Sequence, residues 1–206
     1  MSEPAASALR STVVAGHTGD ITTARAGLAH REGAVRAAAI GALERLSALS
    51  DDDLRHHLSP RAEPDASVRR RAAEAAASHH DLNLLEVLDD PQWSVVEMAC
   101  WALGEHEHAD PNTLDRLIAL ATGHDESLVR EAAVAALGAI GDERGLPAIL
   151  AATTDKAAVR RRAAVSLAPF EHPDADAALE RLLADRDWQT RQIAEDLLDA
   201  RPDAAR

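Results

Sequence analysis

A short motif recurs six times along the chain: a valine, or a threonine in the last copy, followed in most copies by arginine and then by alanine-rich sequence. The copies begin at Val35, Val68, Val95, Val129, Val159 and Thr190, so the spacings between them are 33, 27, 34, 30 and 31 residues. Periods of this length are typical of solenoid proteins, whose repeats bury their apolar faces only against their neighbours. We therefore expect a stack of six similar units.

Each unit reads as a pair of helices. Alanine, the strongest helix former, occupies 46 of the 206 positions, whereas aromatic residues, which favour strands, make up 2%. A Leu-rich segment precedes each motif, at 21–29, 54–58, 82–88, 113–121, 146–153 and 175–184. Residues that favour helix N-caps stand before the motifs: Glu32, Asp65, Ser94, Asp125, Asp155 and Asp187. The chain is predicted to be all-α.

The stretch 125–142, with the sequence DESLVREAAVAALGAIGD, carries the motif most completely. It resembles the short HEAT repeats first described in phycobilisome lyases, and the resemblance extends over about residues 20–200. It implies an α-solenoid of about six helix pairs in a right-handed superhelix. We expect an N-terminal segment at 1–19, partly disordered or a capping helix, a repeat domain at 20–200 and a C-terminal tail at 201–206.

The arginine of the motif recurs as Arg36, Arg69, Arg130, Arg160 and Arg191, while the third copy has Val96 in its place. Each of these arginines has an acidic residue four to six positions earlier. Because a guanidinium group can bind a carboxylate through two parallel hydrogen bonds, this regularity predicts a structural ladder of acid–arginine pairs.

In HEAT-like arrays the second helix of each pair lines the concave surface. By this resemblance, the positions two and six residues after each motif valine would face a groove, and five of them form the predicted binding site: Arg70, Glu97, Trp101, Glu131 and Arg161. Trp101 is either an interface anchor, of the kind enriched at binding hot spots, or a packing residue between repeats. Trp93 and Trp188, each two residues before a motif, are expected to be structural.

The favoured function is a protein-interaction scaffold or adaptor that binds a partner protein or peptide on its concave face. Trp101 would supply apolar contact, the arginines would pair with carboxylates and the glutamates with basic groups. Two alternatives come from the resemblance: a HEAT-like DNA glycosylase of the alkylpurine type, and a bilin lyase or chromophore chaperone subunit. The net charge of −13 opposes nucleic-acid binding, which needs clustered cations to replace counterions.

The sequence predicts no catalytic residues, no metal site and no cofactor. HEAT-like deoxyhypusine hydroxylases bind iron through His-Glu pairs on the motif helices, but the one such pair here, His106-Glu107, is expected in a loop. The other histidines are expected at solvated helix ends, and Cys100 as a buried apolar residue. The single cysteine, the lack of a secretory leader pattern and the lack of long apolar runs predict a cytoplasmic protein without a membrane span.

Overall fold

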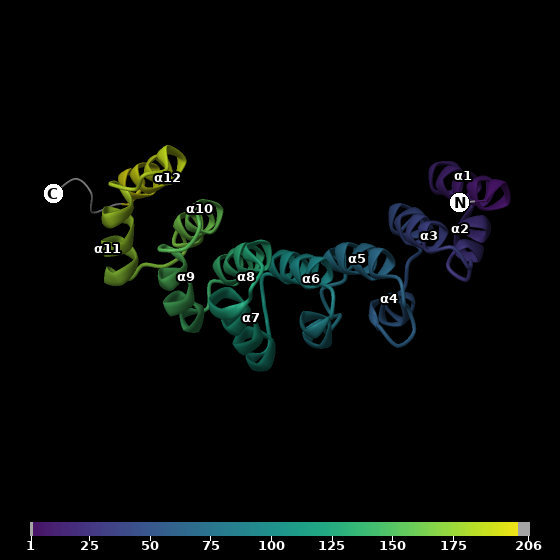
Figure 1. Ribbon diagram of the computed structural model, residues 1–206, viewed down its shortest axis with the longest axis horizontal. Coiled ribbons are helices and arrows are strands. Elements are labelled where there is room, and N and C mark those ends of the chain that lie inside the picture. Colours follow the sequence, from purple (N-terminus) through teal and green to yellow (C-terminus); the bar gives the residue numbers. More distant parts are fainter. Residues whose placement is uncertain (1, 202–206) are drawn as a thin grey trace. The chain divides into compact units, whose positions relative to one another are not determined.

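The computed structural model describes residues 2–201, which form twelve α-helices, three 3₁₀ helices and no strand (Figure 1). All six motifs lie in helices, which we call the motif helices: α3 (Gly33–Arg45), α5 (Ala66–Ala75), α6 (Trp93–His106), α8 (Ser127–Ile140), α10 (Ala157–Ser166) and α12 (Trp188–Asp199). The predicted all-α repeat architecture is confirmed.

The helices that precede them, which we call the leading helices, are α2 (Ile21–Gly27), α4 (Asp51–Leu58), α7 (Pro111–Gly123), α9 (Leu146–Ala152) and α11 (Pro173–Leu182). The third repeat differs, because its leading element is the 3₁₀ helix η2 (Leu85–Asp89). The helix expected at 82–88 is therefore shortened, in keeping with the 27-residue spacing of that repeat. An additional helix, α1 (Glu3–Thr18), precedes the first pair, and η1 (Ala76–Ser78) and η3 (Glu143–Gly145) are short connectors.

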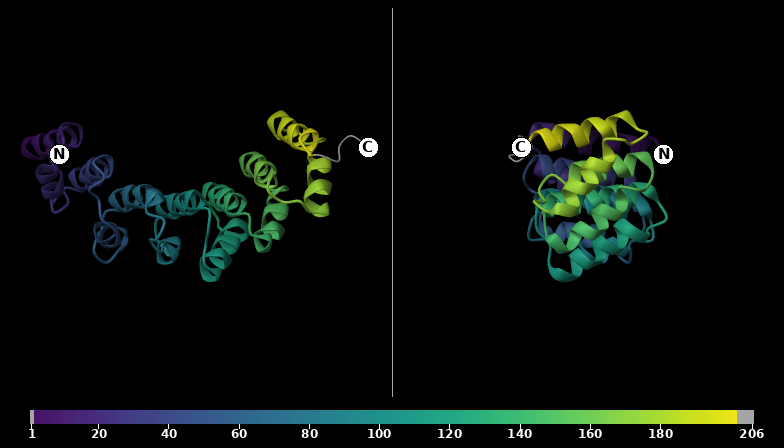
Figure 2. Two further views of the ribbon diagram at one scale, coloured as in Figure 1. Left: turned by 180° about the vertical axis from the view of Figure 1, so that it is seen from behind. Right: turned by 90° about the vertical axis from the view of Figure 1, so that its left-hand side faces the viewer.

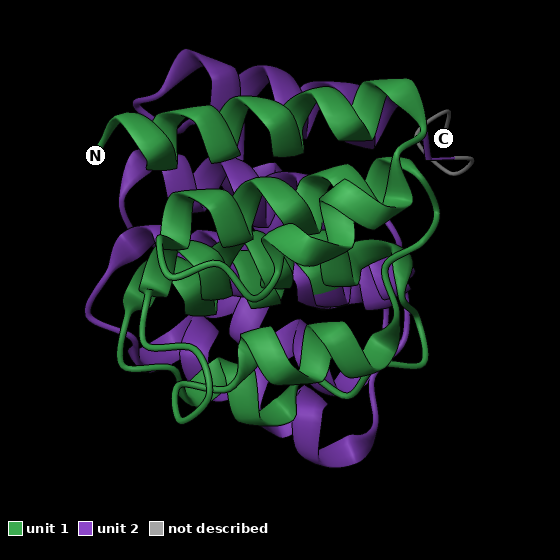
Figure 3. Ribbon diagram, turned by 90° about the vertical axis from the view of Figure 1, so that its right-hand side faces the viewer, with its two compact units in different colours: residues 1–102 green, residues 103–206 purple. Residues whose placement is uncertain are grey.

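The chain divides into two compact units, unit 1 (Met1–Ala102) and unit 2 (Leu103–Arg206), with the division inside α6 (Figure 3). Within unit 1, α1, α3 and α5 pack in sequence as one layer, and α2 and α4 pack against α3 and α5 respectively. Within unit 2, α8, α10 and α12 form one layer and α7, α9 and α11 the other (Figure 2). Each unit is thus a two-layer stack of leading and motif helices.

Small residues allow neighbouring motif-layer helices to approach closely. A Cβ atom added to Gly16 on α1 would lie 2.8 Å from the backbone Cα of Ala42 on α3. In unit 2, a Cβ atom added to Gly138 on α8 would lie 2.5 Å from the Cβ of Ser166 on α10. Most of the alanines in the motif helices are fully buried, so the high alanine content serves the contact between layers as well as helix formation.

Local side-chain bonds set several helix starts. Asp65 and Asp187 accept hydrogen bonds from backbone N–H groups of α5 and α12, as their capping positions predict. Glu32 makes no capping bond. Asp155 does not cap α10 either, since the N-cap is Lys156 and the Asp155 carboxylate is committed to an arginine described below. At the end of α8, Gly141 takes the left-handed conformation with φ of 68°, as expected for a C-terminal glycine.

Candidate functional site

The motif arginines of unit 2 connect successive repeats. Arg130 binds both carboxylate oxygens of Asp155, with Nε and Nη2 at 2.6 and 2.8 Å, and Arg160 binds Asp185 in the same way at 2.8 Å for both. The third nitrogen, Nη1, donates to a backbone carbonyl: Arg160 to that of Asp155 at 2.8 Å, and Arg191 to that of Asp185 at 2.7 Å. Each of these two aspartates therefore holds two arginines from consecutive repeats.

Unit 1 repeats the arrangement with a glutamate. Arg36 binds the Glu63 carboxylate through Nε and Nη2 at 2.7 and 2.6 Å, and the Glu63 carbonyl accepts from Arg69 Nη1 at 2.9 Å. Arg69 in turn binds both carboxylate oxygens of Asp90 at 2.7 and 3.0 Å. The buried His57 contributes a further contact, with Nδ1 at 3.3 Å from the Glu63 carboxylate.

The ladder predicted from the sequence exists, but its pairing was predicted wrongly. The acid that stands five or six residues before an arginine offers that arginine only its backbone carbonyl, and its carboxylate binds the arginine of the preceding repeat. The third motif lacks this step altogether. Val96 replaces the arginine that would bind the Asp125 carboxylate, although the carbonyls of His124 and Asp125 still accept from Arg130 Nη1 at 2.7 and 3.0 Å.

The electrostatics of these groups follow from the same contacts. Hydrogen bonds from Arg130 and Arg160 lower the pKa values of Asp155 and Asp185 below their ordinary range. Burial raises the pKa of Glu63, but the hydrogen bonds from Arg36 and neighbouring donors outweigh it, so this pKa is also lowered. For His57, burial dominates the contact with Glu63 and lowers the pKa, which favours the neutral imidazole. The three carboxylates are thus held in the ionised form that binds arginine, and His57 is favoured in the neutral form that suits burial, which indicates a structural role for these groups.

Three of the five predicted binding residues lie in unit 1. Arg70 on α5 is exposed, Glu97 on α6 is half-buried, and the Trp101 side chain on α6 is 42% exposed. Among residues 2–201, the side chains of Arg70 and Glu97 have no hydrogen bond or ion pair. These two charges and a large apolar side chain are therefore available to a ligand on the motif helices of unit 1.

The other two predicted residues lie in unit 2, where both already have partners. Arg161 donates to the Gln189 side chain at 2.6 Å and lies 3.3 Å from the Asp187 carboxylate. Glu131 lies 4.0 Å from a guanidinium nitrogen of Arg162. A partner protein would have to displace these contacts in order to use either charge.

Several other expectations about single residues are corrected. Trp188 is 64% exposed, so it is not the structural corner residue that its position predicted. His57 and His106 are buried rather than solvated, and His106 is the last residue of α6 rather than part of a loop. Cys100 is buried, as expected.

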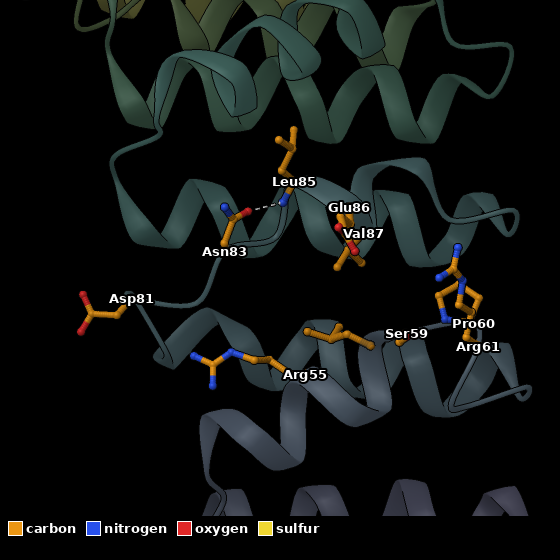
Figure 4. Close-up of a pocket in the computed structure, with 10 residues that line it drawn as sticks. Arg55, Ser59, Pro60, Arg61, Asp81, Asn83, Leu85, Glu86 and Val87 are labelled. Atoms are coloured by element: carbon orange, nitrogen blue, oxygen red, sulfur yellow. Dashed lines mark hydrogen bonds between the residues drawn. The ribbon is translucent and has the colours of Figure 1, made fainter.

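A groove in unit 1 was missed by the sequence interpretation. It lies between the end of α4 and η2 and has a volume of about 850 Å³ (Figure 4). Its lining comes from two segments: Arg55, Leu58, Ser59, Pro60 and Arg61 on one side, and Asp81, Asn83, Leu85, Glu86 and Val87 on the other. The signal that could have revealed it is the 27-residue spacing between Val68 and Val95, which leaves too few residues for a full leading helix.

Two findings concern the part of the chain that the structure describes. No group of three or more His, Cys, Asp or Glu side chains there is arranged to hold a metal ion. None of the helices in residues 2–201 combines the length and apolar character that crossing a bilayer requires.

Comparison with known proteins identifies the class. A family model for HEAT repeats matches residues 82–167, and a model for the PBS lyase HEAT-like repeat matches residues 159–185. The chain is a HEAT-repeat protein. A comparison with curated proteins found no match.

Solved structures share the fold. One is the complex of CpcE and CpcF of phycocyanin lyase from Nostoc sp. PCC7120, with a TM-score of 0.63, 25% identity, and coverage of 87% of this chain and 76% of that one. An engineered protein gives a TM-score of 0.61 at 17% identity, covering 87% and 95%. A designed armadillo repeat protein in complex with the peptide (KR)4 gives 0.59 at 15% identity, covering 87% and 98%.

Proposed function

We propose that this chain is a protein-interaction scaffold or adaptor, and that a partner protein or peptide binds to the motif helices. The observation that carries the proposal is Trp101, a large apolar side chain left 42% exposed on α6. Burying such a side chain against a partner is favourable, and tryptophan is enriched among the residues that dominate binding energy. Arg70 and Glu97, which lack partners among residues 2–201, would add charge recognition in unit 1.

The repeat fold supports this function because stacked helix pairs present extended surfaces to ligands. The designed armadillo repeat protein with a bound peptide is a fold-level example, and at 15% identity it shows the architecture alone. In unit 2, Glu131 and Arg161 would contribute only by exchanging their present contacts for contacts with the partner. We therefore assign the main recognition role to Trp101 and Arg70. The cytoplasmic location stays a prediction.

Site-specific crosslinking tests the proposal. A photoreactive amino acid placed at position 101 in the native cell should crosslink a defined partner, whereas the same group at the exposed Thr22 on α2 should not. Trp101→Ala should weaken capture of that partner by about 30-fold if the tryptophan is a hot spot worth about 2 kcal/mol. Equal crosslinking from both positions, or unchanged capture by Trp101→Ala combined with Arg161→Glu, would show that the motif helices are not the binding surface.

A second function has one specific observation in its favour. A chain in the phycocyanin lyase complex is 25% identical to this one, and the PBS lyase HEAT-like model matches residues 159–185. A bilin lyase or chromophore chaperone role predicts that the protein, co-produced with a bilin, retains visible absorbance after purification. If the protein purified from that co-production shows no visible absorbance, this second function is ruled out. For the alkylpurine DNA glycosylase alternative, the net charge of −13 remains an opposing observation.

A further inference from the structure

The groove between α4 and η2 marks an interruption in the row of leading helices of unit 1 (Figure 4). The five residues of η2 span about 10 Å at 2.0 Å per residue, whereas the 13 residues of α7 span about 20 Å at 1.5 Å per residue. In unit 2, α7 packs against α9 and α9 against α11, so consecutive leading helices are in contact there. The groove occupies the space that a longer leading helix would fill in the third repeat.

The groove has an apolar base. Leu58, from the last turn of α4, and Val87, from η2, are both buried, whereas the half-buried Leu85 at the start of η2 points away from α4 (Figure 4). Leu85 is positioned by Asn83, whose side-chain oxygen accepts a hydrogen bond from the Leu85 backbone N–H at 2.8 Å. An apolar side chain entering this space would contact carbon on both sides, which favours burial of apolar surface from a ligand.

The two walls of the groove carry charges of opposite sign. Arg55 and Arg61 lie on the α4 side, and Asp81 and Glu86 lie on the η2 side. Within residues 2–201, the side chains of three of them, Arg61, Asp81 and Glu86, have no hydrogen bond or ion pair. Arg55 pairs only with Asp51 and Asp52 of its own helix, at 3.6 and 2.7 Å, and exposed pairs of this kind contribute little. The charges that flank the apolar base are thus free to select a ligand.

We propose that this groove binds a short amphipathic helix of a partner protein, whose apolar stripe is bordered by acidic residues toward α4 and by basic residues toward η2. A helix fits because the groove runs between two helical elements, α4 and η2, at the place where the third repeat has only a short leading element. Helices that lay an apolar face into a groove are a common mode of recognition. The order of charges on the walls fixes which flank of the helix must be acidic. This site is separate from the motif-helix residues and does not rest on the proposed function.

A pair of fluorescent probe peptides tests the proposal on the full chain. Both have 14 residues, about 21 Å as a helix, with four leucines at helical spacing. In the first peptide Glu occupies the flank predicted to face α4 and Lys the opposite flank; in the second, Glu and Lys are exchanged, so composition and net charge are equal. Fluorescence anisotropy at low salt should show that the first peptide binds about tenfold more tightly than the second. This difference is what several exposed ion pairs between the peptide and the groove walls would contribute together.

Exchanging charges between the two groove walls of the protein provides the decisive test. The double variant Arg61→Glu with Glu86→Arg leaves each wall with one charge of each sign and should therefore abolish the preference between the two peptides. The matched control, Glu3→Arg with Arg10→Glu on α1, keeps the same net charge at two exposed positions and should leave the preference unchanged. Circular dichroism confirms that both variants fold. Equal binding of the two peptides to the unaltered protein, an undiminished preference in the groove variant, or no binding at about 1 mM peptide would each overturn the proposal.

Discussion

Arg160 offers a direct test of the view that the inter-repeat ladder stabilises the array. Its side chain is 5% exposed and that of Asp185 is 10% exposed, so the small value typical of surface ion pairs does not apply. Arg160→Met removes two hydrogen bonds to Asp185 and one to the Asp155 carbonyl. Breaking a buried pair costs about 3–5 kcal/mol, and because the Asp187 N–H continues to hold the Asp185 carboxylate at 2.7 Å, we expect about 3 kcal/mol.

The assay is urea denaturation followed by far-UV circular dichroism, with thermal unfolding as a second measure. A loss of about 3 kcal/mol corresponds to a fall in Tm of about 6–12 °C for a chain of this size. Arg144→Met is the matched control in the same unit. Arg144 also bridges two repeats, through Asp115, but the two side chains are 49% and 62% exposed, so its removal should cost less than about 1 kcal/mol. Equal losses for the two variants would refute the assignment of stability to the buried ladder.

Three further predictions follow from the structure. Acidification from pH 7.5 to 5.5 should lower the free energy of unfolding, because the pKa of buried His57 is lowered in the folded protein. Below the ordinary pKa of 6.5 the unfolded chain takes up a proton at this residue, whereas the folded chain does not. His57→Leu should therefore reduce the dependence of the unfolding free energy on pH, as measured by urea titrations at several pH values. Gly138→Ala should cost about 1–3 kcal/mol, since the new Cβ would meet Ser166 at 2.5 Å, whereas Gly123→Ala, with nothing within 4 Å, should stabilise by about 0.5–1 kcal/mol in the same assay. Trp188→Gln should change stability by less than about 0.5 kcal/mol, because the side chain is 64% exposed; a larger loss would indicate packing that the exposure does not reveal.

The repeat pattern in the sequence predicted most of the fold. Motif positions such as Val129 and Val159 lie on the buried side of their helices because alanine-rich sequence with one apolar stripe can satisfy its burial only by stacking. The Leu-rich segment at 82–88 was predicted to be a helix like the other leading segments, but a few apolar residues fit a 3₁₀ helix as well as an α-helix. Here the length of the repeat was more informative than its residue types.

Pairing and exposure were less predictable than the helices. Asp155 stands five residues before Arg160, and from the sequence its carboxylate and its carbonyl are equally plausible acceptors; only the packing of one repeat on the next sends the carboxylate to Arg130. Whether a charge in the candidate site is available to a ligand was equally hard to predict from the sequence. The sequence placed Arg161 on a face of its helix, but the contact with Gln189, 28 residues away, decides whether the charge is available.

Because Asp155 and Asp185 each serve two arginines, the repeat between them is a unit that can be gained or lost by a single genetic event. Removing residues 156–185 would take out Arg160 together with its own acid, Asp185. Asp155 would then stand six residues before Arg191, where Asp185 stands now, with its carboxylate still bound to Arg130. Because every acid and arginine left behind would keep a partner of the same kind, such a chain could change in length in whole repeats without passing through an intermediate that has a broken ladder.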